Sequence, residues 1–174
     1  MSITDTPVDN GINLDALLDA RETLDGQPEL AEFEWRATCT WRKGTHSYTT
    51  VKGFGGLGGE QAHRQVFGYD VDHPECFASE DNGATPVELV LVGLAGCLTA
   101  GVASVAQRRG IQLRAVTATL SGDMNLLGVL GADPEVRNGF GAVRVHFNVD
   151  ADASADDIAA LVAQSQKRSA VYDI

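Results

Sequence analysis

Residues 85–110 read TPVELVLVGLAGCLTAGVASVAQRRG, and this stretch decides the fold. The 18 residues 89–106 within it carry no charge. A proline directly after Thr85 is typical of the first turn of a helix, and Gly110 is of the residue type that ends a helix in the left-handed conformation. The stretch therefore predicts one helix over about 86–109, with a length of about 36 Å at 1.5 Å per residue.

An uncharged run of this length reaches the threshold for a membrane span. Two features favour the core of a globular protein instead. The run is rich in Gly, Ala, Ser and Thr, and polar, strand-like sequence flanks it on both sides. We therefore expect a core helix that is buried on nearly every side, with no membrane association, and a membrane helix is the alternative.

Small residues recur along one line of this helix. Gly93, Cys97 and Gly101 follow one another at intervals of four, which places them on one face. A stripe of small residues lets another backbone come close, and a helix this apolar needs more cover than one thin sheet provides. We predict that the matching helix of a second chain packs on the stripe, and the alternative is close packing against the chain's own strands.

The rest of the chain alternates between strand-like and helix-like patterns. The expected elements are, in order, a frayed tail (1–11), a helix from Leu14 to Leu24 capped by Asn13, a hairpin over 33–53, a strand over 65–72, the long helix, strands over 113–121 and 143–149, and a final helix capped by Ser154. Because strands and helices are segregated, this order predicts an α+β fold with a mainly antiparallel sheet wrapped around the long central helix. We divide the chain into an N-terminal tail with a short helix (1–32) and a main domain (33–174).

Composition limits the class of protein. The chain has 174 residues, of which 44% are hydrophobic and 21% charged, an ordinary mix for one globular domain. Thirteen basic against 24 acidic residues give a net charge of −11, which repels nucleic acids and anionic membrane surfaces. The three cysteines are too few for a disulfide scaffold, and Met1 is followed by polar residues instead of a basic, apolar leader. We expect no nucleic-acid partner and a cytoplasmic location with reduced thiols.

Two patterns are similar to cofactor or metal motifs, and both are incomplete. Residues 53–58 fit G-x-G-x-x-G, but the residues after them predict a strand and not the helix that a dinucleotide requires, so we interpret them as a flexible connection. His73 and Cys76 have H-x-x-C spacing, without a second pair to complete a tetrahedral site. We therefore expect neither a cofactor nor a metal.

Cys97 lies about ten residues into the long helix. A thiol in the middle of a buried helix is normally an inert, small hydrophobic group, and this one is beyond the reach of the helix dipole. To react with a peroxide it must ionise, which by this reasoning requires a cation from elsewhere. Arg42, at the tip of the predicted hairpin, is our candidate, and a solvated turn charge is the alternative reading.

The segment 85–98 resembles the long-helix signature of the OsmC and organic hydroperoxide resistance (Ohr) family, in which a proline precedes a helix that leads to a reactive cysteine. The residues WRKG at 41–44 resemble the family's Arg-x-Gly hairpin tip, and the order of elements over 35–174 is similar. The resemblance implies an OsmC-like fold in an intertwined homodimer, with sheets enclosing the central helices and active sites at the subunit interface.

The resemblance also implies a stress-response role through thiol-dependent reduction of organic hydroperoxides. In that chemistry an Arg oriented by a Glu ionises a peroxidatic Cys, which becomes a sulfenic acid and condenses with a resolving Cys. Cys97 matches the peroxidatic position and Arg42 the activating position. The family's Glu position, ten residues before the Cys, holds Val87 in this sequence, so Glu88, one residue later, is the candidate for that role.

The position of the resolving Cys in the final helix holds Ser169, and a hydroxyl cannot form a disulfide. We therefore expect a one-Cys variant, in which an external thiol, or Cys39 or Cys76 if either is near, reduces the sulfenic acid. The alternative is a non-catalytic dimeric protein that binds a small hydrophobic ligand. A purely structural dimeric scaffold is the third hypothesis.

Overall fold

The computed structural model describes residues 7–174, and these form two compact units. The hairpin unit is Asn13–Val90, and the helix unit combines the described residues up to Ile12 with Leu91–Ile174. Residues 1–6, which belong to the predicted tail, lie outside the described residues.

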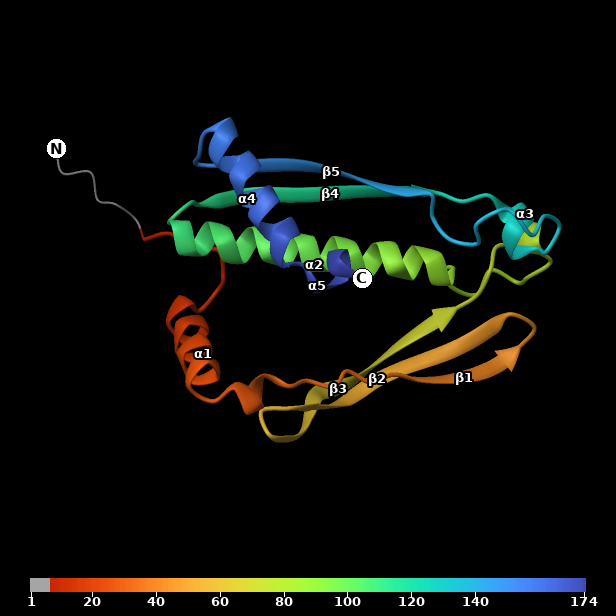
Figure 1. Cartoon of the computed structure of the whole chain (residues 1–174), viewed down its shortest axis with the longest axis horizontal. Helices are drawn as coiled ribbons and strands as arrows, with labels where there is room; N and C mark the ends of the chain where they lie inside the picture. Colours follow the sequence, from red (N-terminus) through yellow and green to blue (C-terminus); the bar gives the residue numbers. More distant parts are fainter. Residues whose placement is uncertain (1–6) are drawn as a thin grey trace. The chain divides into compact units, whose positions relative to one another are not determined.

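The hairpin unit begins with the predicted short helix. In α1 (Leu14–Gly26), the side chain of Asn13 accepts a hydrogen bond from the backbone N–H of Ala16 at 3.0 Å, as an N-cap does. After the short 3₁₀ helix η1 (Pro28–Ala31) comes an antiparallel sheet in the order β1-β2-β3, drawn in Figure 1. Its strands are β1 (Thr38–Lys43), β2 (His46–Gly56) and β3 (Gly59–Val71). The predicted hairpin is thus confirmed, although its first strand starts at Thr38 and not at residue 33.

The glycine-rich stretch is not the flexible connection that we predicted. Its first four residues complete β2, and Leu57 and Gly58 then turn the chain with φ of 51° and 75°. β3 begins directly afterwards, six residues earlier than the strand predicted over 65–72. The glycines serve a long hairpin, and a strand follows them where a dinucleotide site needs a helix.

The loop between β3 and the long helix contains the short 3₁₀ helix η2 (Glu75–Phe77) and is organised around the carboxylate of Asp72, which is 1% exposed. Five donors surround this carboxylate, and they are listed here with their distances: the hydroxyls of Thr45 (2.7 Å) and Ser79 (2.5 Å), the backbone N–H groups of His73 (2.9 Å) and Asn82 (3.0 Å), and the Asn82 amide (2.8 Å). The Ser79 and Thr45 hydroxyls are the largest causes that hold the pKa of Asp72 well below its usual range. The carboxylate therefore stays charged and fixes the loop to the β1–β2 turn.

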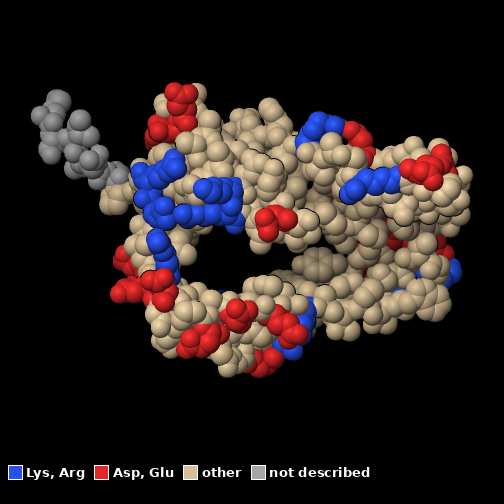
Figure 2. Space-filling model, in the orientation of Figure 1, with Lys and Arg blue, Asp and Glu red and all other residues tan. Residues whose placement is uncertain are grey.

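The long helix α2 (Pro86–Arg109) has the predicted bounds, and Gly110 follows it at φ 67°. Figure 2 shows basic side chains gathered at its C-terminal end, where Arg108 and Arg109 lie and where positive charge is favourable to the helix dipole. From Leu91 onward α2 belongs to the helix unit.

In the helix unit a two-stranded antiparallel sheet runs along α2, and the last helices cross α2 (Figure 1). Besides α2, the helix unit contains β4 (Leu113–Asp123), α3 (Leu126–Val129), β5 (Ala142–Ala151), α4 (Ala155–Arg168) and α5 (Ala170–Asp173). As predicted, Ser154 caps α4, accepting a bond from the N–H of Asp157 at 3.2 Å. Leu161 and Ser165 of α4, four residues apart on one face of the helix, are buried. This α+β arrangement confirms the predicted fold class.

The small-residue stripe of α2 faces the chain's own C-terminal helices. Three pairs meet along it: Gly101 with Ser165, Cys97 with Ser169, and Gly93 with Val171. A Cβ atom at Gly101 would lie 2.2 Å from the Ser165 Oγ, so only glycine permits this approach. The prediction that a second chain's helix packs on the stripe is therefore wrong, and so is the alternative of the chain's own strands, because α4 and α5 occupy this face.

Burial of α2 differs from the expectation of cover on nearly every side. The helix is long and apolar enough to cross a membrane by length and composition, with a mean hydropathy of 2.2 over its most apolar window, of which 28% is buried. Val92 is 63% exposed, and Gly96 and Ala100, four and eight residues further along the helix, are exposed as well. Within the helix unit, an apolar face of α2 is thus left uncovered.

The tail predicted as frayed is docked over residues 8–10. Their backbone groups are hydrogen-bonded to the side chains of Gln107 and Gln112, close to the end of α2. The sequence argument failed here because amide side chains that bind a distant backbone leave no periodic pattern.

We expect Gly101→Ala to lower the free energy of unfolding by about 1–3 kcal/mol, since the new methyl group would separate α4 from α2. Gly93→Ala is the matched control on the same helix. Its Cβ would lie 4.0 Å from Val171, so it should be neutral or stabilising by up to about 1 kcal/mol through helix propensity. Chemical denaturation followed by circular dichroism measures both. Equal effects of the two substitutions would contradict the close contact at Gly101.

Candidate functional site

The sulfur of Cys97 faces the start of α5. The hydroxyl of Ser169 donates a hydrogen bond to the Cys97 Sγ at 3.1 Å. The same hydroxyl oxygen accepts a bond from the backbone N–H of Tyr172, also at 3.1 Å, and Ser169 is only 4% exposed. Since a hydroxyl has one proton, this arrangement commits that proton to the sulfur.

The junction of the last two helices places these donors. Ser169 is both the residue after α4 and the N-cap of α5, with an extended backbone at φ −81° and ψ 114°. The first N–H groups of α5 have no partner within the helix, and those of Val171 and Ala170 contribute to the lowered pKa of the Cys97 thiol. Serine is strongly preferred at an N-cap. A serine at position 169 therefore both starts α5 and supplies the hydroxyl that donates to the Cys97 sulfur.

These contacts make Cys97 more acidic than an ordinary cysteine. The Ser169 hydroxyl is the main cause that lowers the pKa of the Cys97 thiol, and the Val171 and Ala170 N–H groups add to it, while burial acts in the opposite direction. All three donors are neutral, so groups other than a cation contribute to the lower pKa of this thiol, and the predicted cation remains a separate prediction. The thiolate is the nucleophilic form of cysteine, and this is the chemistry that the site supports.

Arg42 lies at a β-bulge near the end of β1. Trp41 pairs with Ser47 and Lys43 with His46, so that Arg42 is the extra residue of the bulge. Its guanidinium carbon lies 5.3 Å from the centre of the Tyr48 ring, and the side chain is exposed. Arg42 belongs to the hairpin unit and Cys97 to the helix unit, so its action on the thiol stays a prediction.

Glu88 has the contacts of a helix cap. Its carboxylate accepts bonds from the Thr85 N–H at 2.8 Å and the Thr85 hydroxyl at 3.0 Å, while its own N–H donates to the Thr85 Oγ1 at 3.3 Å. This is a capping box, which the sequence T-x-x-E could have indicated. Glu88 lies nine residues before Cys97 on the same helix, about 13.5 Å along the axis, so the two side chains are not brought together. Its orienting role stays a prediction.

From the sequence Ser169 is only a missing resolving cysteine, whereas in the structure its hydroxyl is the hydrogen-bond donor to the Cys97 sulfur. Cys39 and Cys76 are exposed free thiols of the hairpin unit. The hydroxyls of Thr49 and Ser47 lower the pKa of the Cys39 thiol. Their participation in resolution stays a prediction. Across residues 7–174, no cluster of three or more His, Cys, Asp or Glu side chains is placed to hold a metal ion.

The comparisons with known proteins agree with the described architecture. A family model described as OsmC-like protein matches residues 79–174. The chain is similar in structure to an OsmC-like protein from Mycoplasma pneumoniae, with a TM-score of 0.61 and 16% identity over 80% of this chain and 85% of that one. No curated protein sequence matches the chain.

Two further solved structures have the same fold. An organic hydroperoxide resistance protein OsmC from Legionella pneumophila has a TM-score of 0.56 and 19% identity, covering 80% of this chain and 86% of that one. An OsmC-like protein of unknown function from Vibrio cholerae has a TM-score of 0.58 and 11% identity, covering 80% and 92%. At these identities the likeness establishes a common fold.

We expect Ser169→Ala to raise the pKa of the Cys97 thiol, because the substitution removes the main donor to its sulfur. The ultraviolet absorbance of the thiolate against pH, recorded in a background lacking Cys39 and Cys76, measures this value. Ser165→Ala is the matched control, since its hydroxyl donates to the Leu98 carbonyl at 2.6 Å. If the pKa of the Cys97 thiol were the same in Ser169→Ala as in wild type, the proposed role of the Ser169 hydroxyl would be refuted.

Proposed function

This chain belongs to the OsmC-like protein family, and from that premise we propose that it reduces organic hydroperoxides through Cys97 in a stress response. The observation that supports this most is the hydrogen bond from the buried Ser169 hydroxyl to the Cys97 sulfur, at 3.1 Å. Donors that lower the pKa of a thiol raise the fraction present as thiolate, which is the form that a peroxidase needs.

The proposed reaction starts with attack of the Cys97 thiolate on the terminal oxygen of the hydroperoxide. A sulfur–oxygen bond forms with a sulfur electron pair while the oxygen–oxygen bond breaks, and the released alkoxide takes a proton to become an alcohol. Cys97 is oxidised to a sulfenic acid and the hydroperoxide is reduced. The hydroxyl of Ser169 and the α5 N–H groups hold the thiolate in place before the attack.

Recovery of the thiol requires a reductant from outside the site, because Ser169 offers a hydroxyl where a resolving Cys would stand. We propose that an external thiol condenses with the sulfenic acid to form a mixed disulfide and water. A second external thiol then releases the Cys97 thiol and a small disulfide. Arg42 as activating cation and Glu88 as its orienting partner remain part of this proposal on the family resemblance alone.

We also propose that the chain works as a homodimer in the cytoplasm, with no nucleic-acid or membrane partner. An exposed line on α2 supports this assembly, since Val92, Gly96 and Ala100 recur at intervals of four and leave small side chains uncovered. It is a different line from the stripe that α4 and α5 occupy. A second copy would cover this apolar face, which water solvates poorly.

A specific cavity favours the alternative of a binding protein for a small hydrophobic ligand. It has a volume of about 220 Å³, lies within the helix unit, and is lined mainly by Leu98, Val145, Phe147 and Val162. Gln166 and Tyr172 also line it, so the pocket suits a compact molecule that is mainly apolar and carries one polar group. The peroxidase hypothesis requires Cys97 to be oxidised and regenerated in each turnover, whereas the binding hypothesis does not.

We expect turnover of cumene hydroperoxide with dithiothreitol to fall to background in Cys97→Ser, because only the thiolate can accept the oxygen. Cys39→Ser and Cys76→Ser are the matched controls: each keeps the wild-type rate where dithiothreitol alone reduces the sulfenic acid, and a lower rate in either would assign that thiol a part in resolution. Undiminished turnover in Cys97→Ser would remove this residue from the mechanism. An inactive wild-type protein that retains an apolar molecule in native mass spectrometry would favour the binding hypothesis.

For the assembly we expect wild-type protein to sediment as a dimer and Gly96→Glu to shift it towards monomer, because the new charge would be buried in an apolar interface. A Cβ at Gly96 meets no atom of the described chain within 4 Å, so the fold tolerates the side chain. Ala160→Glu, on the exposed side of α4, is the matched control. Analytical ultracentrifugation of wild type, Gly96→Glu and Ala160→Glu measures the oligomeric state. A monomeric wild-type protein would contradict the proposed dimer.

A further inference from the structure

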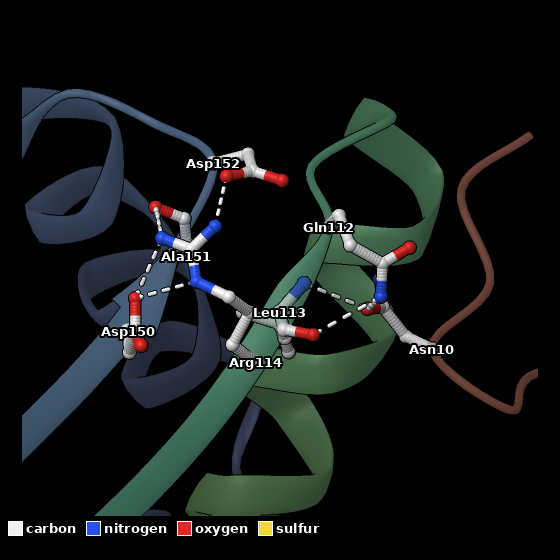
Figure 3. A network of polar contacts seen from close by, with 7 residues as sticks. All are labelled: Asn10, Gln112, Leu113, Arg114, Asp150, Ala151 and Asp152. Atoms are coloured by element: carbon white, nitrogen blue, oxygen red, sulfur yellow. Dashed lines mark hydrogen bonds and ion pairs between the residues drawn. The ribbon is translucent and has the colours of Figure 1, made fainter. Parts of the chain in front are cut away.

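The segment Val8–Asn10 lies against the link between α2 and β4, and Figure 3 shows how Asn10 meets it. The Asn10 Nδ2 donates to the Ile111 carbonyl at 2.9 Å, and its Oδ1 accepts from the Leu113 N–H at 2.9 Å. The Gln112 Nε2 donates to the same Oδ1 at 3.1 Å. The amide of Asn10 therefore binds a carbonyl and an N–H as a neighbouring strand would.

Two glutamines bind the backbone of the same segment. The Gln112 Oε1 accepts from the Asp9 N–H and its Nε2 donates to the Asp9 carbonyl, both at 3.0 Å. The Gln107 Oε1 accepts from the Asn10 N–H at 2.7 Å, and its Nε2 donates to the Val8 carbonyl at 3.0 Å. These contacts bind the backbone of the segment whatever its side chains, whereas the Asn10 position requires one donor and one acceptor.

We call Gln107, Ile111, Gln112 and Leu113 the cradle. Arg114, the residue after the cradle in β4, is held by contacts that do not involve Val8–Asn10. Its side chain pairs with Asp150 and Asp152 and donates to the Ala151 carbonyl (Figure 3). Reciprocal backbone bonds combined with one selective side-chain position are also how proteins bind extended peptides. The cradle thus has the form of a peptide site with a resident peptide.

The resident segment ends at a turn suited to release. Gly11 has φ 76°, and its N–H donates to the Asp9 Oδ1 at 2.8 Å, within the segment itself. After Ile12 the chain enters the hairpin unit and returns through α2 at Leu91. Residues 13–90 are consequently held at one end by the cradle and at the other by α2.

We propose that the cradle is a peptide-binding site, that Val8–Asn10 occupies it as a detachable clasp, and that the same sequence binds there in trans when the clasp is disabled. In the wild type the covalent link gives the clasp a high effective concentration, so a free peptide competes poorly. This inference is independent of the chemistry of Cys97.

The test uses full-length Asn10→Ala and a fluorescent peptide of residues 7–12, PVDNGI. We expect the peptide to bind this variant at least about tenfold more tightly than it binds wild type, as fluorescence anisotropy measures, because the substitution removes the three bonds of the Asn10 side chain and so weakens the hold of the cradle on the clasp. A peptide with Ala or Asp in place of Asn should bind at least about tenfold more weakly, since Ala offers neither bond and Asp offers no donor to the Ile111 carbonyl.

Hydrogen exchange gives a second readout that does not depend on the label. The Leu113 N–H should exchange faster in Asn10→Ala and regain protection when the peptide is added. Asp9→Ala is the matched control, because the cradle binds Asp9 through its backbone, and both its exchange and its peptide binding should equal those of wild type. Equal peptide affinity for wild type and Asn10→Ala, equal affinity of the Asn and Ala peptides, or unchanged protection of the Leu113 N–H would each overturn the proposal.

Discussion

The packing of the helix unit depends on the close approach of α4 to α2 at Gly101. Ser165 occupies the space that a side chain at Gly101 would fill, and its hydroxyl is bonded to the carbonyl of Leu98. One turn further along α4 this contact leaves Ser169 against Cys97, so the same packing that closes the core also supplies the donor to the sulfur. Core packing and thiol chemistry are therefore two results of one helix crossing.

The sequence predicts the long helix well, because its proline, its uncharged run and its terminal glycine act locally. It does not predict what covers the helix. The spacing of Gly93, Cys97 and Gly101 indicates that a backbone comes close, but α4 is brought there by a connection, residues 110–154, that no local pattern describes. The prediction of a flexible connection at 53–58 is wrong for a related reason, because glycine permits a turn and a strand alike.

The candidate site was only half visible in the sequence. Cys97 was identified by resemblance, while its donor Ser169 was read as the loss of a partner thiol. Glu88 has a cap partner three residues away, a local pattern that was present and overlooked. The contacts of Asn10 with the cradle join residues about one hundred positions apart, and such contacts between amide groups have no signature before the chain is folded.

The buried carboxylate of Asp72 has a consequence for tolerance to acid. Its depressed pKa means that its bonds stabilise the folded loop at every pH above the ordinary range of a carboxyl group, and this stabilisation is lost only as the pH falls through the depressed value. Thr45 and Ser79 would release the β1–β2 turn from the loop before α2 only under strongly acidic conditions. In a mildly acidified cell, the segment that carries Arg42 and leads into the long helix would thus keep its native connection.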